Sequence, residues 1–91
     1  MKPLPDAGTA TPLVLKFDDN RLLGAVFGEH DRNLARIEKA LGVMVSSRGN
    51  RVAISGSAGA QRAAGAVLTN LYQQVRGGHY VNDMAVSGAI S

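Results

Sequence analysis

The sequence contains no cysteine and no tryptophan, and its aromatic residues are two Phe and two Tyr. Without cysteine the chain can form no disulfide framework, thiolate nucleophile or thiolate metal site. No apolar run approaches the ~20 residues that a membrane-spanning helix needs, and residues 1–12 lack the apolar stretch of a secretory signal. We therefore expect a cytoplasmic protein without a membrane partner, whose core is built mainly from small and aliphatic side chains.

The rest of the composition is typical of one small globular domain. The chain has 91 residues, of which 45% are apolar and 19% charged, which suits a single domain and is too short for two. Eleven glycines predict many turns. The formal net charge of +3 favours a negatively charged partner, although a dedicated electrostatic binder usually carries a denser basic cluster.

Apolar spacing and turn residues predict an α+β domain at residues 12–77, preceded by a flexible Pro- and Gly-rich leader at residues 1–11. A three-stranded sheet should be covered on one face by three helices. The predicted order is a strand at 13–17, helices at 21–27 and from Asp31 to about Leu41, a hairpin whose strands flank Gly49-Asn50, and a helix at 58–76.

Capping residues mark the predicted helix ends. Asp31 is expected to cap the second helix, because its side-chain oxygen can accept from early helical N–H groups. Ser57 should cap the third helix in the same way, and Gly28 and Gly42 are suited to leaving the first two helices.

Residues 78–91 are predicted to be a linker followed by the start of a helix, with Asn82 or Asp83 as its cap. This helix has no stop signal before Ser91, so we expect it to lead into a further domain. The apolar stretch from Tyr80 to Ile90 is expected to pack on another domain or on a neighbouring copy.

Several short motifs carry a family resemblance over about residues 13–78. They are Asp19-Asn20, Gly28 with Asp31-Arg32-Asn33-Leu34, Ile37-Glu38 with Leu41-Gly42-Val43, and Arg48-Gly49-Asn50. Together they resemble the N-terminal region of PhoH-like (phosphate-starvation-inducible) P-loop ATPases. The element order β-α-α-β-β-α also resembles a type I KH domain, in which a G-x-x-G loop clamps the nucleic-acid backbone.

For the parent protein, this resemblance implies an ATPase domain that uses ATP and Mg, RNA as a substrate, and an endoribonuclease partner. The present sequence contains no G-x-x-x-x-G-K-[ST] motif, so no cofactor is expected in this chain. The chain would then be a non-catalytic KH-like accessory module that positions single-stranded RNA for the ATPase domain.

The expected nucleic-acid-binding residues lie in the first interhelical loop, on the second helix and beside the hairpin turn: Gly28, His30, Arg32, Arg36, Lys39, Arg48 and Arg51. Arg32, Arg36 and Lys39 share one helix face by their spacing. Arg48 and Arg51 are expected to approach the same cleft from its other side. The alternative is an ordinary solvated helix face and a charged turn.

The loop Gly28-Glu29-His30-Asp31 departs from the KH pattern, because Asp31 replaces the second glycine and Glu29 adds another negative charge. It is either a phosphate clamp or a capped helix start. These acids favour a second hypothesis, in which the chain is a degenerate KH-like module for protein interaction or self-association. No catalytic residue or metal ligand is expected, because the serines have no base at a recognisable spacing and His79 has no companion ligands.

Overall fold

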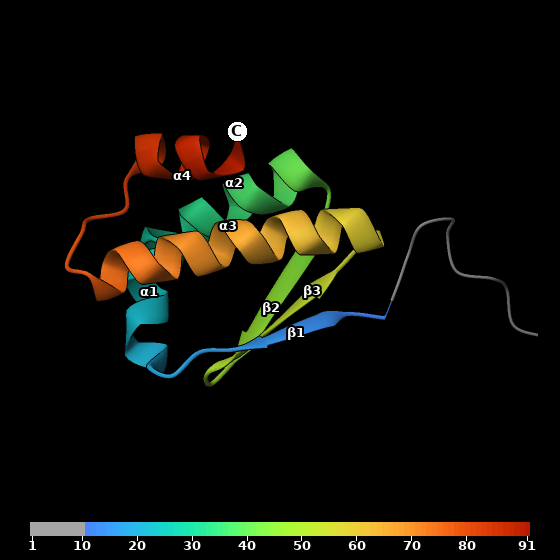
Figure 1. Ribbon diagram of the computed structural model, residues 1–91, viewed down its shortest axis with the longest axis horizontal. Helices are drawn as coiled ribbons and strands as arrows, with labels where there is room; N and C mark the ends of the chain where they lie inside the picture. Colours follow the sequence, from blue (N-terminus) through green and yellow to red (C-terminus); the bar gives the residue numbers. More distant parts are fainter. Residues whose placement is uncertain (1–10) are drawn as a thin grey trace, which may run out of the picture.

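The computed structural model describes residues 11–91, so the predicted leader at residues 1–11 lies outside the described residues except for Thr11. The strands are β1 (Leu13–Lys16), β2 (Met44–Arg48) and β3 (Arg51–Ser55), and the helices are α1 (Leu23–Phe27), α2 (Arg32–Leu41), α3 (Ala58–Arg76) and α4 (Asp83–Ile90) (Figure 1). The predicted α+β fold with the KH-like order β-α-α-β-β-α and a further C-terminal helix is confirmed.

The three strands form one antiparallel sheet in the order β1-β3-β2. In the β2–β3 hairpin Arg48 lies opposite Arg51, which leaves Gly49 and Asn50 as the predicted two-residue turn. Gly49 has φ 62°, a left-handed conformation that glycine adopts without steric cost. On the outer edge of β2 the Val45 N–H donates to Glu38 Oε2 at 2.8 Å, so an α2 carboxylate satisfies a strand-edge donor.

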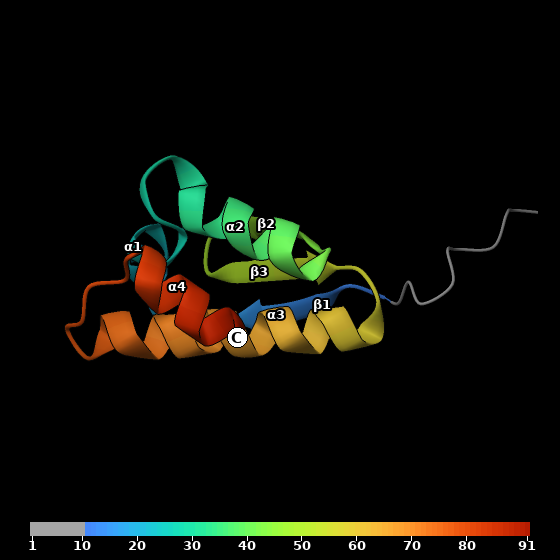
Figure 2. The same ribbon diagram turned by 90° about the horizontal axis from the view of Figure 1, so that it is seen from above.

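One face of the sheet carries the core. Helices α2 and α3 lie on this face, and α1 packs against both of them (Figures 1 and 2). A Cβ atom at Gly65 would lie 3.1 Å from Leu13 Cδ2, so the absence of a side chain lets α3 lie close to β1. The core is as aliphatic as the composition predicts, and its most deeply buried side chains are Val26, Ile37, Val52, Ile54, Leu68, Leu71 and Val86.

The C-terminal helix differs from its prediction, because it packs on this same domain. Helix α4 lies across α2 and α3 (Figure 1), and Val86 is fully buried in the common core together with Val81. The buried side of the segment is thus covered by its own chain, and it is Tyr80 and Met84 that remain exposed. Composition alone could not distinguish these partners, since an apolar helix face only requires some apolar surface to cover it.

Most predicted caps are present. Ser57 Oγ accepts from the Ala60 N–H at 3.1 Å and starts α3 at the predicted residue. Asn82 Oδ1 accepts from the Ala85 N–H at 2.9 Å and starts α4. Gly42 ends α2 with φ 68°, the left-handed C-cap conformation.

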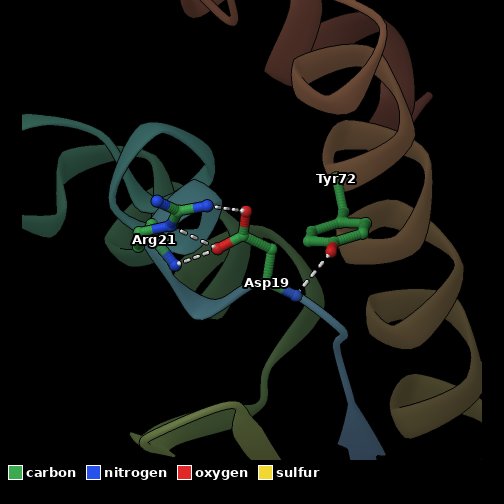
Figure 3. Close-up of polar contacts among 3 residues, drawn as sticks. All are labelled: Asp19, Arg21 and Tyr72. Carbon is green, nitrogen blue, oxygen red and sulfur yellow. Dashed lines mark hydrogen bonds and ion pairs between the residues drawn. The ribbon is translucent and has the colours of Figure 1, made fainter.

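The predicted first helix at 21–27 is divided into a 3₁₀ turn at Asn20–Leu22 and the α-helix α1. Asp19 starts this turn: its Oδ1 accepts from the Arg21 N–H, and its carboxylate also binds the Arg21 guanidinium through Nε and Nη2 at 3.0 and 3.1 Å (Figure 3). The Asp19 N–H in turn donates to the Tyr72 hydroxyl at 3.0 Å. The chain leaving β1 is thereby tied to α3. The Phe17 and Tyr72 rings also pack there in a tilted arrangement, with their centroids 4.6 Å apart.

The Asp19–Arg21 pair predicts a pH-dependent contribution to stability. The Arg21 side chain holds the pKa of the Asp19 carboxyl below its ordinary value. Because the folded-state pKa is lowered, this contribution is present near neutral pH and is lost as the pH falls through the folded-state pKa. Asp19→Asn keeps a capping oxygen but removes the charge, so it should slightly lower the free energy of unfolding at neutral pH.

Urea unfolding of both proteins over a pH series measures this effect. The difference between wild type and Asp19→Asn should shrink on acidification. Asp18→Asn is the matched control, because the neighbouring Asp18 makes no ion pair within residues 11–91. A difference that stays constant down to strongly acidic pH would show that the ion pair contributes nothing.

Candidate functional site

The loop between α1 and α2 adopts an unusual backbone conformation. Gly28 has φ 82° and ψ 170°, and both His30 (φ 56°, ψ 30°) and Asp31 (φ 56°, ψ 29°) are left-handed. Left-handed non-glycine residues are uncommon, and two in succession are costly outside glycine-rich loops. The backbone therefore takes a course suited to glycine, although glycine is present only at its first position.

Asp31 does not cap α2 as the sequence predicted. It occupies the N-cap position, but its side chain makes no capping hydrogen bond. An N-cap side chain reaches the early helical N–H groups from an extended backbone, and the left-handed backbone of Asp31 directs its carboxylate elsewhere. The capped-helix interpretation of this loop is therefore wrong in its mechanism, and Asp31 remains an exposed carboxylate.

Gly28 and Asn33 fasten the two ends of this loop together. Asn33 is only 3% exposed, and its Nδ2 donates to the Val26 carbonyl at 3.2 Å. A Cβ atom at position 28 would lie 2.7 Å from that same Nδ2 atom. Only glycine leaves room for this amide, which ties the start of α2 to the end of α1.

The loop forms one wall of a cleft of about 480 Å³. The opposite wall is the connection from α3 to α4, which brings Tyr80 and His79 across from Gly28 and Arg32. Tyr80 is 85% exposed, so its ring is accessible to a ligand. The full lining is Gly24, Ala25, Gly28, Glu29, Arg32, Asn33, His79, Tyr80, Val81, Asn82 and Asp83.

Charges of both signs line this cleft. Arg32 and His79 are the basic groups, and Glu29 and Asp83 are the acidic ones. The two carboxylates oppose a bare phosphate here, since like charges repel at short range. Amide, imidazole and phenol groups can instead hydrogen-bond or stack on a planar, neutral ligand such as a nucleobase.

The predicted site residues are distributed over three depressions that share no lining residue. Gly28 and Arg32 line the cleft, while His30 is an exposed loop residue. Arg36 and Lys39 line a groove of about 440 Å³ against the end of α4. Arg48 and Arg51 line a depression of about 320 Å³ on the sheet.

Helix α4 changes the expected basic face of α2. The Arg36 guanidinium donates to Ser87 Oγ of α4, and Ser87, Ile90 and Ser91 lie along the same groove as Lys39. Arg36 is thus engaged within the domain, so the face formed by Arg32, Arg36 and Lys39 is not a continuous free surface.

The second wall of the cleft was not predicted from the sequence. His79 was considered only as a metal ligand, and Tyr80 only as part of an apolar tail. The available signal was an aromatic residue and a histidine directly after Gly77-Gly78, where the chain must change direction after α3. Nothing in the local pattern indicated that this turn would bring them beside Gly28.

Within residues 11–91 no group of three His, Cys, Asp or Glu side chains is placed to hold a metal ion. Among the same residues no helix has both the length and the apolar character to cross a membrane.

Comparisons with known proteins address the fold. No protein-family model matches the chain, and no curated protein matches it. The 1.5 Å crystal structure of a protein of unknown function from Aeropyrum pernix is similar, with a TM-score of 0.66 and 16% sequence identity over 89% of this chain. The chain spans 46% of the length of that protein. This similarity supports the fold alone.

The left-handed conformation of Asp31 predicts a residue-specific stability pattern. Asp31→Val should lower the free energy of unfolding by about 1–2 kcal/mol, because a side chain with a β-branch is strained at positive φ. Asp31→Gly should leave stability unchanged or raise it. Arg32→Val is the matched control, since Arg32 is exposed and helical, and it should cost only about 0.5 kcal/mol. Chemical denaturation measures all three; an equal cost for both valine variants would contradict the left-handed assignment.

Proposed function

We propose that this chain is a non-catalytic KH-like module that positions single-stranded RNA, and that the cleft between the Gly28–Asp31 loop and the α3–α4 connection receives a base. The observation that carries the proposal is that the exposed Tyr80 lines the same cleft of about 480 Å³ as Gly28 of the left-handed loop. Single-stranded RNA is recognised through splayed bases that stack on aromatic side chains and hydrogen-bond along their edges.

Each wall of the cleft has a role in this proposal. Tyr80 supplies a stacking surface whose phenol can also donate or accept. Arg32, at the first position of α2, supplies a cation at a helix start. Glu29 and Asp83 keep phosphates away from the cleft and can accept from exocyclic amines, so the cleft selects the base and the RNA backbone must pass elsewhere.

The family resemblance supports a wider proposal for the parent protein. The motifs from Asp19-Asn20 to Arg48-Gly49-Asn50 resemble the front of PhoH-like ATPases. In that case ATP and Mg would bind a P-loop domain elsewhere in the cytoplasmic parent protein, and this module would present RNA to it. An endoribonuclease that acts on the same RNA would be the natural partner.

A second candidate function is protein interaction or self-association by a KH-like module that no longer binds RNA. It is favoured by the acids at the cleft, Glu29 and Asp83, and by the exposed apolar side chain of Met84 on α4. Exposed aromatic and methionine side chains are enriched at protein interfaces.

The first candidate predicts that Tyr80→Ala weakens RNA binding by about 1–3 kcal/mol, the usual contribution of a base–aromatic stack. Tyr80→Phe should keep most of the affinity. Met84→Ala is the matched control, because Met84 is equally exposed but does not line the cleft. Fluorescence anisotropy with labelled oligouridine at low salt measures the affinities, and equal affinities of wild type and Tyr80→Ala would exclude the cleft as the base site.

The second candidate predicts a concentration-dependent dimer that Met84→Asp disrupts, because a charge there would be buried at the contact. Size-exclusion chromatography with light scattering measures the mass of both proteins. A monomer over the whole accessible concentration range, together with RNA binding by the same sample, would rule out self-association as the function.

A further inference from the structure

The face of the sheet turned away from the helices carries a row of three cations. The register places Lys16 of β1 opposite Arg51 of β3, and Arg51 opposite Arg48 of β2. All three residues are exposed. Because neighbouring strands lie about 4.8 Å apart, the row crosses the whole sheet within about 10 Å. We call Lys16, Arg51 and Arg48 the cation row.

The cation row is not neutralised within the described part of the chain. Among residues 11–91 the one ion pair is Arg21–Asp19, on the connection to α1. Asp18 is the nearest carboxylate in sequence, and it lines a neighbouring depression with Lys16 and Arg76 without forming an ion pair. Like charges directly opposite each other destabilise a sheet, so the row is a local cost that an anionic ligand would remove.

The surface beside the row carries hydrogen-bond donors that suit a phosphate. Arg48 and Arg51 border a depression of about 320 Å³ that also includes Ser46, Ser47 and the small side chain of Ala53. Guanidinium groups bind phosphate oxygens in bidentate fashion. The hydroxyl of Ser46, which shares the face of Arg48 by strand alternation, adds a further donor. No aromatic or large apolar side chain lines this depression. The exposed apolar side chains of this face, Val14 and Met44, lie further along the strands from the cation row.

We propose that the cation row binds the phosphate backbone of single-stranded RNA, on the open face of the sheet. This inference rests on the proposed function and deepens it by separating two contacts. The hairpin turn lies below α1 in Figure 1, and the α3–α4 connection lies beyond α1 on its upper side. In this proposal one extended strand passes α1, with a base in the cleft and its phosphates along the row, which positions the strand without reading its sequence.

The test removes the three charges while keeping polar side chains of similar shape. The wild-type chain and the triple variant Lys16→Gln, Arg48→Gln, Arg51→Gln are titrated with labelled oligouridine at several salt concentrations. Each phosphate contact on a single strand contributes about 0.7 to the slope of log affinity against log salt. The triple variant should therefore bind more weakly at low salt and lose about 2 from that slope, and the loss should be the same with oligoadenosine.

A pair of variants separates the effect of the cation row from the effect of the net charge of the chain. Arg51→Gln should weaken binding and also raise the unfolding midpoint of the free protein, because Arg51 opposes both other cations. Arg62→Gln is the control, because it removes the same charge from the exposed surface of α3. Arg62 lies beside Leu13, at the end of β1 opposite to Lys16. This variant should change neither quantity appreciably.

The outcomes distinguish this inference from the proposed function. RNA binding with an unchanged salt slope in the triple variant would overturn the inference and leave the function standing. An absence of RNA binding by the wild-type chain at low salt would overturn both. Binding of polyglutamate that equals RNA binding and disappears in the triple variant would assign the row to acidic proteins, which also contradicts the proposal.

Discussion

The structure depends on the burial of one face of α3. This helix contacts β1, β3 and each of the other three helices, and its inward residues include Val67, Leu68 and Leu71. With so few aromatic side chains, the core gains its apolar burial from aliphatic groups distributed along one long helix. Gly65 lets that helix approach the sheet closely, and the Tyr72 hydroxyl accepts from the Asp19 N–H. A substitution that moves α3 would displace both the cleft and the cation row.

Because α3 and α2 occupy one face of a three-stranded sheet, the candidate contacts lie on two of the surfaces that remain accessible. One is the end of the helical layer, where the Gly28 loop meets the α3–α4 connection. The other is the open face of the sheet. The first has mixed charge and an exposed ring, and the second has cations and hydroxyls. This division matches the two parts of an RNA strand, since bases stack and hydrogen-bond whereas phosphates need cations.

Local signals predicted most of the fold, and long-range placement explains what they missed. The limits of α3 followed from Ser57 and the glycines after Arg76, and the hairpin turn followed from Gly49-Asn50, because each depends on neighbouring residues alone. The docking of α4 could not be predicted, since an apolar helix face can pack on any apolar surface and its sequence does not specify which one. The conformation of Asp31 was missed because aspartate suits both an N-cap and a left-handed position, and the contact between Gly28 and Asn33 decides between them.

The same distinction accounts for the candidate site. Arg48 and Arg51 could be selected from the sequence as turn-flanking cations. Lys16 could not, because strand register across β1 and β3 is a long-range property. The left-handed loop and the cation row are also the two places where the chain departs from its locally favoured state. Such departures persist when the surrounding structure enforces them, here through the buried Asn33 amide and the strand register. In the proposed function, RNA phosphates bound at the cation row would offset the second of these two costs.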